Sequence, residues 1–357
     1  MERRLRAGIG GGEIMKQLVT ERLVLRAFRR EDFAAVHAYA STVENTIYMP
    51  FGPNSEQETR AFIDRSIAAW SEEPLRQYGF AVTRKDTGEV VGGCELSLVP
   101  SGNEGEIGWM LRRDCWRQGF GTELGRALLA LAFDGLGLHR VFAICDAQNQ
   151  ASFGLMEKLG MRREGLFLEA RVPNKLSDAP YGDELRYAML ESEWRIRQEM
   201  DAYNALPCAF DGFPDMPLLD DGEIRLVCEK KLPAEPEKKY VPSYEFAVCR
   251  GSEKIGTVNL RVGYTDALYY CGHIGYGIDE KYRGRGYAGA ACRLLVSVAR
   301  LHGMKKLIIT NNVENAASRR VCEKLGARLV RRARVPEWSG IYADGIRFAN
   351  IFELSGD

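Results

Sequence analysis

The sequence predicts an α/β (α+β) protein built from two tandem copies of one domain, and three observations support this. The chain has 357 residues, which is too long for one ordinary core and about right for two domains. Several segments recur in the same order in its two halves. Within each half, runs with strand periodicity alternate with helical runs. We therefore expect two related domains that combine sheets with flanking helices.

The internal repeat fixes how the two halves correspond, and a duplication affects every later inference. A strand-like run, a glycine-bearing stretch that opens a helix, and a helix ending in EKLG occur twice. The pairs are GEIGWML (105–111) with GHIGYGI (272–278), RQGFGTELGRALLALA (117–132) with GRGYAGAACRLLVSVA (284–299), and NQASFGLMEKLGM (149–161) with NAASRRVCEKLGA (315–327). Each candidate site in one half therefore has a counterpart in the other.

The first copy opens with a strand, which is followed by two amphipathic helices and three strands joined by hairpin-like turns. A helix follows the glycine pair, and a strand, a short helix that ends at Gly160 and a last strand complete the copy. The expected strands are 22–28, 78–84, 90–99, 105–112, 140–145 and 183–190, and the expected helices are 31–42, 57–73, 122–137 and 151–160.

The second copy lacks the first helical pair. After its first strand, RLVC (225–228), the proline-bearing stretch KKLPAEPEKKYVPS (230–243) stands where the two helices would be. The predicted divisions are a flexible N-terminal extension at 1–14, an N-terminal domain at 15–205, a linker at 206–221 and a C-terminal domain at 222–357. We expect Met15 to be the true start, because ordered structure is predicted directly after it.

The composition is that of a soluble globular protein, with 45% hydrophobic and 27% charged residues. No apolar run approaches the roughly 20 residues that span a bilayer. The 49 basic and 49 acidic residues cancel, so no global field attracts nucleic acid or an acidic membrane. The nine cysteines include no C-x-x-C pair, which argues against disulfides and zinc. We expect a cytoplasmic protein without metal, nucleic-acid or membrane partners.

Two glycine-punctuated stretches, RDCWRQGFGTE (113–123) and EKYRGRGYAGA (280–290), each lie between a strand and a helix. Recurrence argues against a bare turn. GRGYAG (284–289) satisfies the dinucleotide motif G-x-G-x-x-G, and Asp146 follows the near match in the first copy. In a dinucleotide fold, however, the glycines open the domain, whereas several strands come first here. The third interpretation is a pyrophosphate cradle of backbone N–H groups at a helix N-terminus.

The second loop, RGRGYA (283–288), resembles that of the GNAT superfamily of acyl-CoA-dependent N-acyltransferases, which has the form R/Q-x-x-G-x-G/A. The first copy has Trp116 in place of the arginine and is similar to the Rim-type branch, which acetylates ribosomal-protein N-termini and related small amines. The N-x-x-S…EKLG segments, 149–160 and 315–326, match the family's second cofactor motif.

The resemblance covers nearly all of 16–195 and most of 222–355. It implies that each copy is a mixed, largely antiparallel twisted sheet flanked by helices, and that acetyl-CoA (coenzyme A) is the cofactor. It also implies that one strand of each copy binds the pantetheine arm, that the loops bind pyrophosphate, and that two asparagines orient the arm. The residues carried over are Ile107, Trp109, Leu111, Gln118, Gly119, Phe120, Gly121, Thr122, Asn149, Ile274, Tyr276, Ile278, Arg283, Gly284, Arg285, Gly286, Tyr287, Ala288 and Asn315.

The implied reaction is direct attack by a primary amine on the acetyl thioester in a ternary complex, which makes the chain an acyltransferase. A lysine-like amine with a pKa of about 10.4 is rarely neutral at pH 7, so a general base is needed. Glu106 and His273 occupy matching positions in the two copies and are candidate bases. Glu169 is a further candidate, because the Rim-type branch has a glutamate at the like position.

The thiolate that leaves must gain a proton. Many family members use a tyrosine in the second motif, but Met156 and Cys322 stand there. We expect Ser152 and Ser318, the serines of N-x-x-S, to serve as the acids, although helix capping is an equally reasonable role for them.

The acceptor is a peptide or protein α-amino group or a small amine, and we prefer the former. The first helical pair, with Tyr48, Phe51 and Trp70 nearby, is expected to form one wall of the acceptor pocket in the first copy. The second copy either retains cofactor binding or imitates the dimer partner of single-domain relatives, which would make the chain a monomer with an internal pseudo-dimer. The alternatives are an acyl-CoA sensor or structural protein without turnover, and a dinucleotide-binding protein.

Overall fold

The computed structural model describes residues 17–173, 175–238 and 240–355. The chain divides into two compact units, Met1–Arg197 and Gln198–Asp357, and each unit is described by itself. Among the described residues, no helix combines the length and the apolar composition that crossing a membrane requires. The predicted extension at 1–14 lies outside the described residues.

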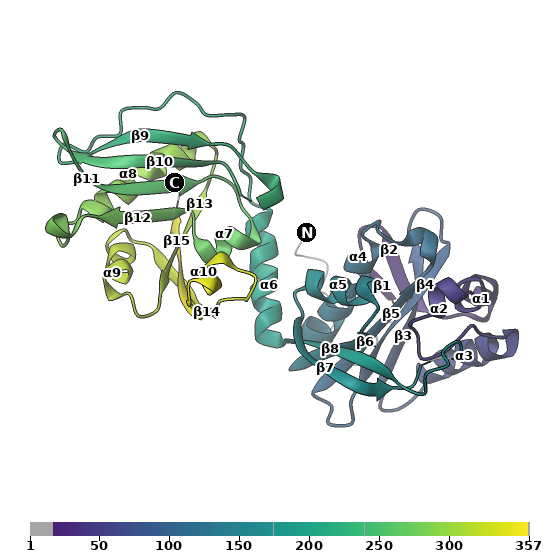
Figure 1. The fold of residues 1–357 in the computed structure, drawn as a ribbon. Coiled ribbons are helices and arrows are strands. Elements are labelled where there is room, and N and C mark those ends of the chain that lie inside the picture. The colour runs from purple at the N-terminus through teal and green to yellow at the C-terminus, as the bar shows by residue number, and fades with distance from the viewer. Residues whose placement is uncertain (1–16, 174, 239, 356–357) are drawn as a thin grey trace. The chain divides into compact units, whose positions relative to one another are not determined.

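The N-terminal unit contains one eight-stranded sheet with the order β1-β2-β3-β4-β5-β6-β8-β7 (Figure 1). All neighbouring strands are antiparallel except β5 and β6, which are parallel. The strands are β1 Gln17–Val19, β2 Leu23–Ala27, β3 Gln77–Arg84, β4 Val90–Leu98, β5 Glu104–Leu111, β6 Arg140–Asp146, β7 Arg162–Arg171 and β8 Gly182–Leu190.

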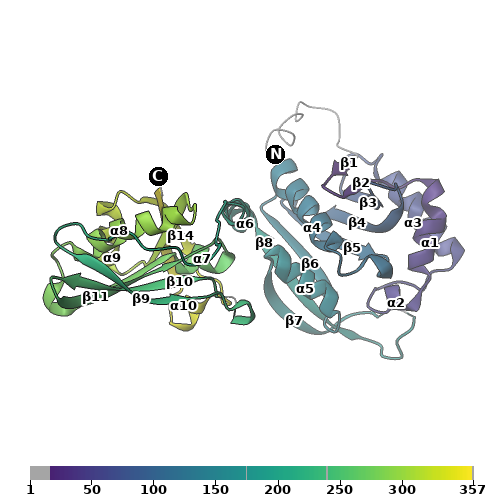
Figure 2. The same cartoon turned by 90° about the horizontal axis from the view of Figure 1, so that it is seen from above.

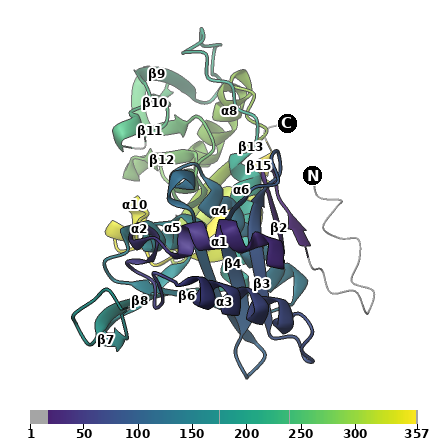
Figure 3. The same cartoon turned by 90° about the vertical axis from the view of Figure 1, so that its right-hand side faces the viewer.

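Helices cover both faces of this sheet. The helices are α1 Phe33–Ala40, α2 Val43–Thr46, α3 Glu56–Ala69, α4 Phe120–Ala130, α5 Gln150–Leu159 and α6 Glu191–Asn204, with a π-turn at Leu131–Gly135 and 3₁₀ turns at Arg30–Asp32 and Arg113–Cys115. Figure 2 shows α1 and α3 on one side of the sheet and α4 and α5 on the other. Figure 3 views the α1 and α3 side. The helix α6 contains the division between the units.

Strand alternation produces two cores in this unit. Phe80 and Leu96 belong to the cluster that packs against Leu124 and Leu128 of α4. Ala81, the next residue of β3, belongs to the second cluster, with α1 and α3. Neighbouring residues of a strand point to opposite faces, so one strand serves both cores.

The C-terminal unit divides its strands between two sheets, with the orders β12-β11-β10-β9 and β13-β15-β14. The strands are β9 Arg225–Leu232, β10 Ser243–Arg250, β11 Glu253–Arg261, β12 Ile274–Ile278, β13 Lys306–Asn312, β14 Arg328–Arg334 and β15 Phe348–Ser355. The helices are α7 Asp266–Cys271, α8 Tyr287–Leu301, α9 Ala316–Lys324 and α10 Gly340–Ala343, with 3₁₀ turns at Pro236–Lys238 and Glu280–Tyr282.

The predicted fold class and the tandem arrangement are confirmed, and so is the loss of the first helical pair from the second copy. Between β9 and β10, the described residues form only the 3₁₀ turn Pro236–Lys238 and an isolated bridge. The stretch predicted as a linker packs against the C-terminal core: Leu219 is buried, and the ring centroid of Phe213 lies 5.1 Å from that of Tyr244.

Candidate functional site

The strands β5 and β6 diverge in the middle of the N-terminal sheet. They pair only where Glu104–Glu106 lies beside Arg140–Phe142, while β5 continues to Leu111 and β6 to Asp146. Beyond the last pair, Ile107–Leu111 keeps its bonds to β4 but pairs with no strand of the described residues on the β6 side. Apart from Leu111 O, which accepts from Asn45 and Trp116, main-chain polar groups on that edge of β5 are therefore available to a ligand.

The glycine loop of the N-terminal unit ends in a helix N-terminus without a side-chain cap. Gly119, the N-cap residue of α4, has φ +84° and makes no capping bond. By contrast, Ser55 caps α3 and Asn149 caps α5. The first N–H groups of an α-helix lack intrahelical partners, so the start of α4 can donate to an anion.

The matching loop of the C-terminal unit has the same backbone. Gly286, the N-cap residue of α8, has φ +90° and also lacks a side-chain cap. Two residues earlier, Gly284 has φ +80°, and its counterpart Arg117 adopts the same left-handed region with φ +58°. Left-handed backbone is costly for a residue other than glycine, so its presence in both loops indicates a shared loop geometry.

Trp116 and Arg283 make equivalent contacts, which explains the departure of the first loop from the family motif. The indole Nε1 of Trp116 donates to Leu111 O at 2.7 Å, and Nε of Arg283 donates to Ile278 O at 3.0 Å. Each carbonyl belongs to the last residue of its strand, β5 or β12. Both side chains therefore fasten the loop to the preceding strand through an N–H donor.

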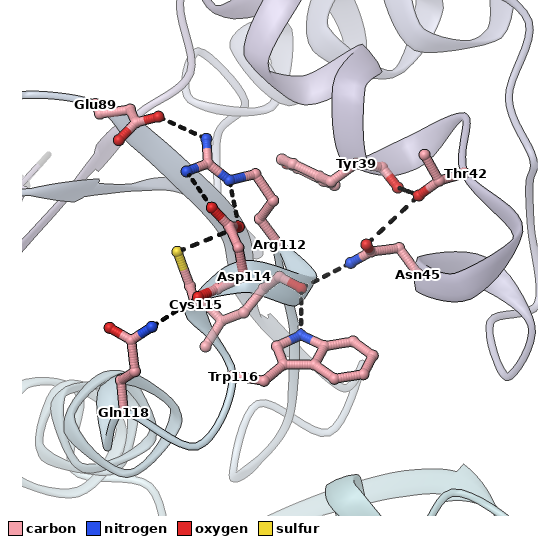
Figure 4. Close-up of polar contacts among 10 residues, drawn as sticks. Tyr39, Thr42, Asn45, Glu89, Arg112, Asp114, Cys115, Trp116 and Gln118 are labelled. Carbon is pink, nitrogen blue, oxygen red and sulfur yellow. Dashed lines mark hydrogen bonds and ion pairs between the residues drawn. The ribbon is translucent and has the colours of Figure 1, made fainter.

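Polar contacts hold the rest of the first loop in place. The guanidinium of Arg112 pairs with Asp114 and Glu89, each at 2.6 Å. Gln118 Nε2 donates to Asp114 O at 2.6 Å. Figure 4 shows these side chains around the loop. From outside the predicted set, Arg22 donates to Gln118 O at 2.9 Å. A sequence motif could not reveal Arg22, because it lies far from the loop along the chain.

Gly121, which the sequence assigned to cofactor binding, also has a role in packing. A Cβ added there would lie 2.9 Å from Cδ2 of Leu155 on α5. Gly125 is similarly close to Leu159, at 2.6 Å. These glycines let α4 and α5 approach, which aligns the start of α4 with the diverging strands.

Glu106 lies at the point where β5 and β6 separate. Its neighbour Ile107 is in the α4 core, so the Glu106 side chain lies on the opposite face of the sheet. Burial raises the pKa of Glu106, and the nearby carboxylates of Glu95 and Glu184 raise it further, whereas Arg186 opposes the shift. A carboxylate with a raised pKa is a better general base near neutral pH than an ordinary one.

Ser152 and Asn149 lie in the first turn of α5, directly after β6. Asn149 Oδ1 accepts from the main-chain N–H of Ser152 at 3.1 Å, so it caps the helix. The Ser152 hydroxyl is partly exposed and interacts with the thiol of Cys145, whose pKa is raised to about 11 by burial. Asn315 caps α9 in the same way by accepting from Ser318 N at 2.9 Å.

The environment of His273 contradicts the predicted role of this residue as a general base. It is fully buried, and its Nδ1 accepts from Ile308 N at 2.7 Å. Its Nε2 lies 2.9 Å from Gly263 O and 3.0 Å from the Tyr203 hydroxyl. Burial lowers its pKa to about 4. We correct the prediction: both ring nitrogens hold main-chain segments together, so neither can take a proton from an amine.

Ser318 is also engaged in the structure. Its Oγ lies 2.8 Å from the hydroxyl of Tyr276, which projects from β12. The pair joins β12 to α9, the helix that follows β13. Ser318 could serve as an acid only if its hydroxyl turned from Tyr276 to the cofactor, whereas the predicted role of Tyr276, which uses its main chain, is not affected by this bond.

Glu169 is exposed on the edge strand β7 and has φ +51°. Its N–H donates to Asp183 Oδ1 at 2.9 Å, within a bulge of the β7–β8 pairing. The described contacts of Glu169 involve its main chain, and its predicted role as a second base stays a prediction.

A model of the acetyltransferase (GNAT) domain matches the chain twice, over residues 22–162 and 209–328. The chain belongs to the GNAT acetyltransferase family. Its sequence is 31% identical over 177 residues to the uncharacterized N-acetyltransferase YnaD of Bacillus subtilis (strain 168), a match that spans 50% of this chain and 98% of that protein. The uncharacterized N-acetyltransferase p20 of Bacillus licheniformis is 33% identical over 43% of this chain and 85% of its own length.

Solved structures also match about half of this GNAT chain. A GNAT-family acetyltransferase from Bacillus anthracis is 31% identical, with a TM-score of 0.44, over 49% of this chain and 99% of that chain. An acetyl transferase from Salmonella typhimurium, described as modifying the N-terminal serine of ribosomal protein L7/L12, is 20% identical with a TM-score of 0.43, over 48% and 97%.

Proposed function

We propose that the N-terminal unit transfers an acetyl group from acetyl-CoA to a primary amine, with a peptide or protein α-amino group as the preferred acceptor. One observation carries this proposal: β5 leaves β6 directly after Glu106 and leads to an uncapped helix N-terminus. A donor site and a candidate base thereby belong to one strand-loop-helix segment.

The residues around the point where β5 and β6 diverge are suited to binding acetyl-CoA, the acetyl donor. The start of α4, from Gly119 to Thr122, would hold the pyrophosphate, and the free edge of Ile107–Leu111 would bind the pantetheine arm through main-chain groups. Arg22 lies beside the loop, where its carbon Cζ is 4.6 Å from the ring centroid of Phe120, and its charge is balanced by Glu123, which its Nε contacts at 2.8 Å. When bound, acetyl-CoA supplies an acyl carbon activated as a thioester.

In the proposed mechanism Glu106 receives the proton that the acceptor ammonium must lose, directly or through water. Burial and the carboxylates of Glu95 and Glu184 keep the pKa of Glu106 raised. Glu184 is paired with Arg186 at 2.7 Å, so Glu95 is the carboxylate that favours a cationic acceptor at this face. Ser152, in the first turn of α5, would donate the proton that the thiolate gains as the carbon–sulfur bond breaks, and would regain a proton, directly or through water, from the nitrogen that has attacked the thioester.

We propose that the C-terminal unit is not a second transfer centre. The position of Glu106 is taken there by His273, whose ring nitrogens are both engaged. In addition, Tyr276 and Ser318 form a bond between β12 and α9. Its loop retains the uncapped helix start, so cofactor binding without turnover is compatible with this role.

Calorimetric titration with acetyl-CoA, with NAD as the control ligand, tests the donor site, and release of free thiol in the presence of amines tests transfer. The acceptors should include peptides with a free α-amino group, polyamines, aminoglycosides and amino acids. Acetyl-CoA binding followed by thiol release supports the proposal. Binding without release would favour a sensor, and binding of NAD alone would overturn the assignment of the donor.

A further inference from the structure

The short helix α2 is tied to the free end of β5. Asn45 Nδ2 donates to Leu111 O at 2.7 Å, the same carbonyl that accepts from Trp116. Figure 4 shows Asn45 and Trp116 pointing to the same place on the main chain. The Leu111 carbonyl thus connects α2 with the loop that precedes α4.

The residues directly after α2 are tied to the free end of β6. The main-chain carbonyl of Tyr48 accepts from Nη2 of Arg171 at 3.0 Å. Nη1 of Arg171 pairs with Asp146, the last residue of β6, at 2.8 Å. The two side chains are 10% and 19% exposed, so this ion pair is screened by solvent far less than a surface pair.

Residues 43–48 therefore connect the ends of the two strands that diverge after Glu106, and we call this segment the strap. It follows directly on α1, which packs on the face that carries Glu106. Met110 lies four residues after Glu106 on β5 and packs against the cluster formed with α1 and α3. Strand residues separated by an even number share a face, so Glu106 is on that face too.

The C-terminal unit has no counterpart of the strap. Among the residues that the structure describes, helices α1 and α2 have no equivalent between β9 and β10. Asn312 stands at the position of Asp146 and provides no carboxylate, although the arginine of the repeated tetrapeptide ARVP is retained as Arg334. Among the described residues, the hydrogen bond of Asn45 and the contacts of Arg171 therefore belong to the N-terminal unit alone, whose candidate base is Glu106.

We propose that the strap closes the open end of the gap between the diverging strands β5 and β6, on the face of the sheet that carries Glu106. We further propose that Asn45 and Arg171 are positioning residues that set the affinity for the acceptor amine. This inference rests on the proposed acetyl transfer. The strap crosses the face from which an amine reaches Glu106, whereas the anion-binding start of α4 belongs to the opposite face. Loosening the strap should therefore weaken acceptor binding more than acetyl-CoA binding.

Two variants disrupt one tie each. Asn45→Ala removes the donor to Leu111 O, while Trp116 still fastens the loop. Arg171→Lys keeps a cation for Asp146 but replaces the two guanidinium nitrogens that contact Asp146 and Tyr48 O by a single nitrogen on a flexible stem, which weakens the contact with Tyr48. The control is Glu56→Ala in the neighbouring helix α3, because Glu56 is 68% exposed and its pair with Arg60 is 3.5 Å long.

Hydrogen–deuterium exchange of the full chain tests the strap without any turnover. We expect faster exchange at residues 43–51 in Asn45→Ala and Arg171→Lys, and no change in Glu56→Ala. Unchanged exchange in both tie variants would overturn the strap, whatever the enzyme assays show. For both Asn45→Ala and Arg171→Lys, calorimetry with acetyl-CoA should give a dissociation constant within about twofold of the wild type.

Steady-state kinetics with acetyl-CoA and a pentapeptide with a free α-amino group tests positioning. A net hydrogen bond of about 0.5–1.5 kcal/mol corresponds to a rise in the acceptor KM of roughly 2- to 10-fold, with kcat nearly unchanged. Faster exchange with an unchanged acceptor KM would overturn positioning and leave acetyl transfer intact. If wild-type protein transfers to no amine of the panel, acetyl transfer fails, and positioning fails with it.

Discussion

The two units place different residues at the same structural position, and the difference separates a proposed base from a residue with structural contacts. Glu106 and His273 both lie where two central strands separate. Glu106 is partly exposed, and its pKa is raised by partial burial and by neighbouring carboxylates. His273 is fully buried and bonded through both ring nitrogens. A titratable residue at a matching position is therefore not enough to assign catalysis, because its free lone pairs and its access to solvent decide what it can do.

The strand arrangement differs in the same way. In the N-terminal unit, β5 and β6 retain three paired residues and then diverge within one sheet. In the C-terminal unit, β12 and β13 belong to separate sheets, and His273 supplies contacts between them: its N–H donates to Ile308 O at 2.7 Å, and its ring accepts from Ile308 N. The histidine thus substitutes for lost strand pairing.

The largest difference between the two units should appear in the turnover of matched loop variants. Gly119→Glu introduces a carboxylate at the proposed anion site, on left-handed backbone, and should reduce turnover by at least about 100-fold through charge repulsion. Gly286→Glu carries the same backbone strain in open space and should leave turnover within about twofold. Thiol release with the pentapeptide measures both, and equal losses would place the C-terminal loop in the reaction.

The pH dependence of kcat/KM should sharpen the assignment of Glu106. Since its pKa is raised, activity should fall as the pH drops through a value above the ordinary glutamate pKa of about 4.3. Glu95→Gln removes a neighbouring charge and should move this acid limb to lower pH. An acid limb that does not respond to Glu95→Gln would argue against Glu106 as the titrating base.

Stability of the C-terminal unit should depend on pH through His273. Its folded pKa is about 4, below the ordinary histidine value of about 6.5, so the unfolded chain binds a proton that the folded chain does not. Stability should therefore decrease as the pH falls from about 6.5 to 4, by about 3 kcal/mol. Burial lowers the pKa of His302 in the same direction.

Denaturant unfolding, followed by hydrogen exchange at β12 and β13, measures this loss. His273→Gln should be less stable at pH 7 but should show a shallower decline between pH 6.5 and 4. A decline as steep as in the wild type would show that His273 is not the responsible group.

The smallest effect should come from replacing Trp116, the side chain that bonds the first loop to the end of β5. Trp116→Arg replaces one N–H donor by another and should change the dissociation constant of acetyl-CoA by less than about threefold. Trp116→Phe removes the donor to Leu111 O and should cost about 1 kcal/mol, or roughly fivefold in affinity. Calorimetry distinguishes the two, and equal losses would show that the indole acts by packing alone.

Much of this fold was predictable because its sequence signals are local. Strand alternation and the EKLG ends of the two short helices are each visible within a few residues. The repeat then showed which helices the second copy lacks. The strand β7, with its charged and exposed residues, and the inserted helix α7 were not predicted, because neither follows a simple periodicity.

The site was predictable only in part, because residue type does not report environment. Gly119 and Gly286 were identified from a motif whose backbone requirement is local. The burial of His273 and the reach of Arg171 to Tyr48 depend on contacts between segments that are distant in sequence. Such contacts follow from packing and leave no short motif, so Asn45, Arg171 and Arg22 were missed.

The most direct test of the central claim is the kcat of two matched variants, Glu106→Gln and His273→Gln, with acetyl-CoA and the pentapeptide at a temperature where both are folded. Glu106→Gln should lose about 100-fold or more in kcat, whereas His273→Gln should stay within about twofold of the wild type. A large loss in His273→Gln together with a nearly unchanged Glu106→Gln would refute the role of Glu106 and assign transfer to the C-terminal unit.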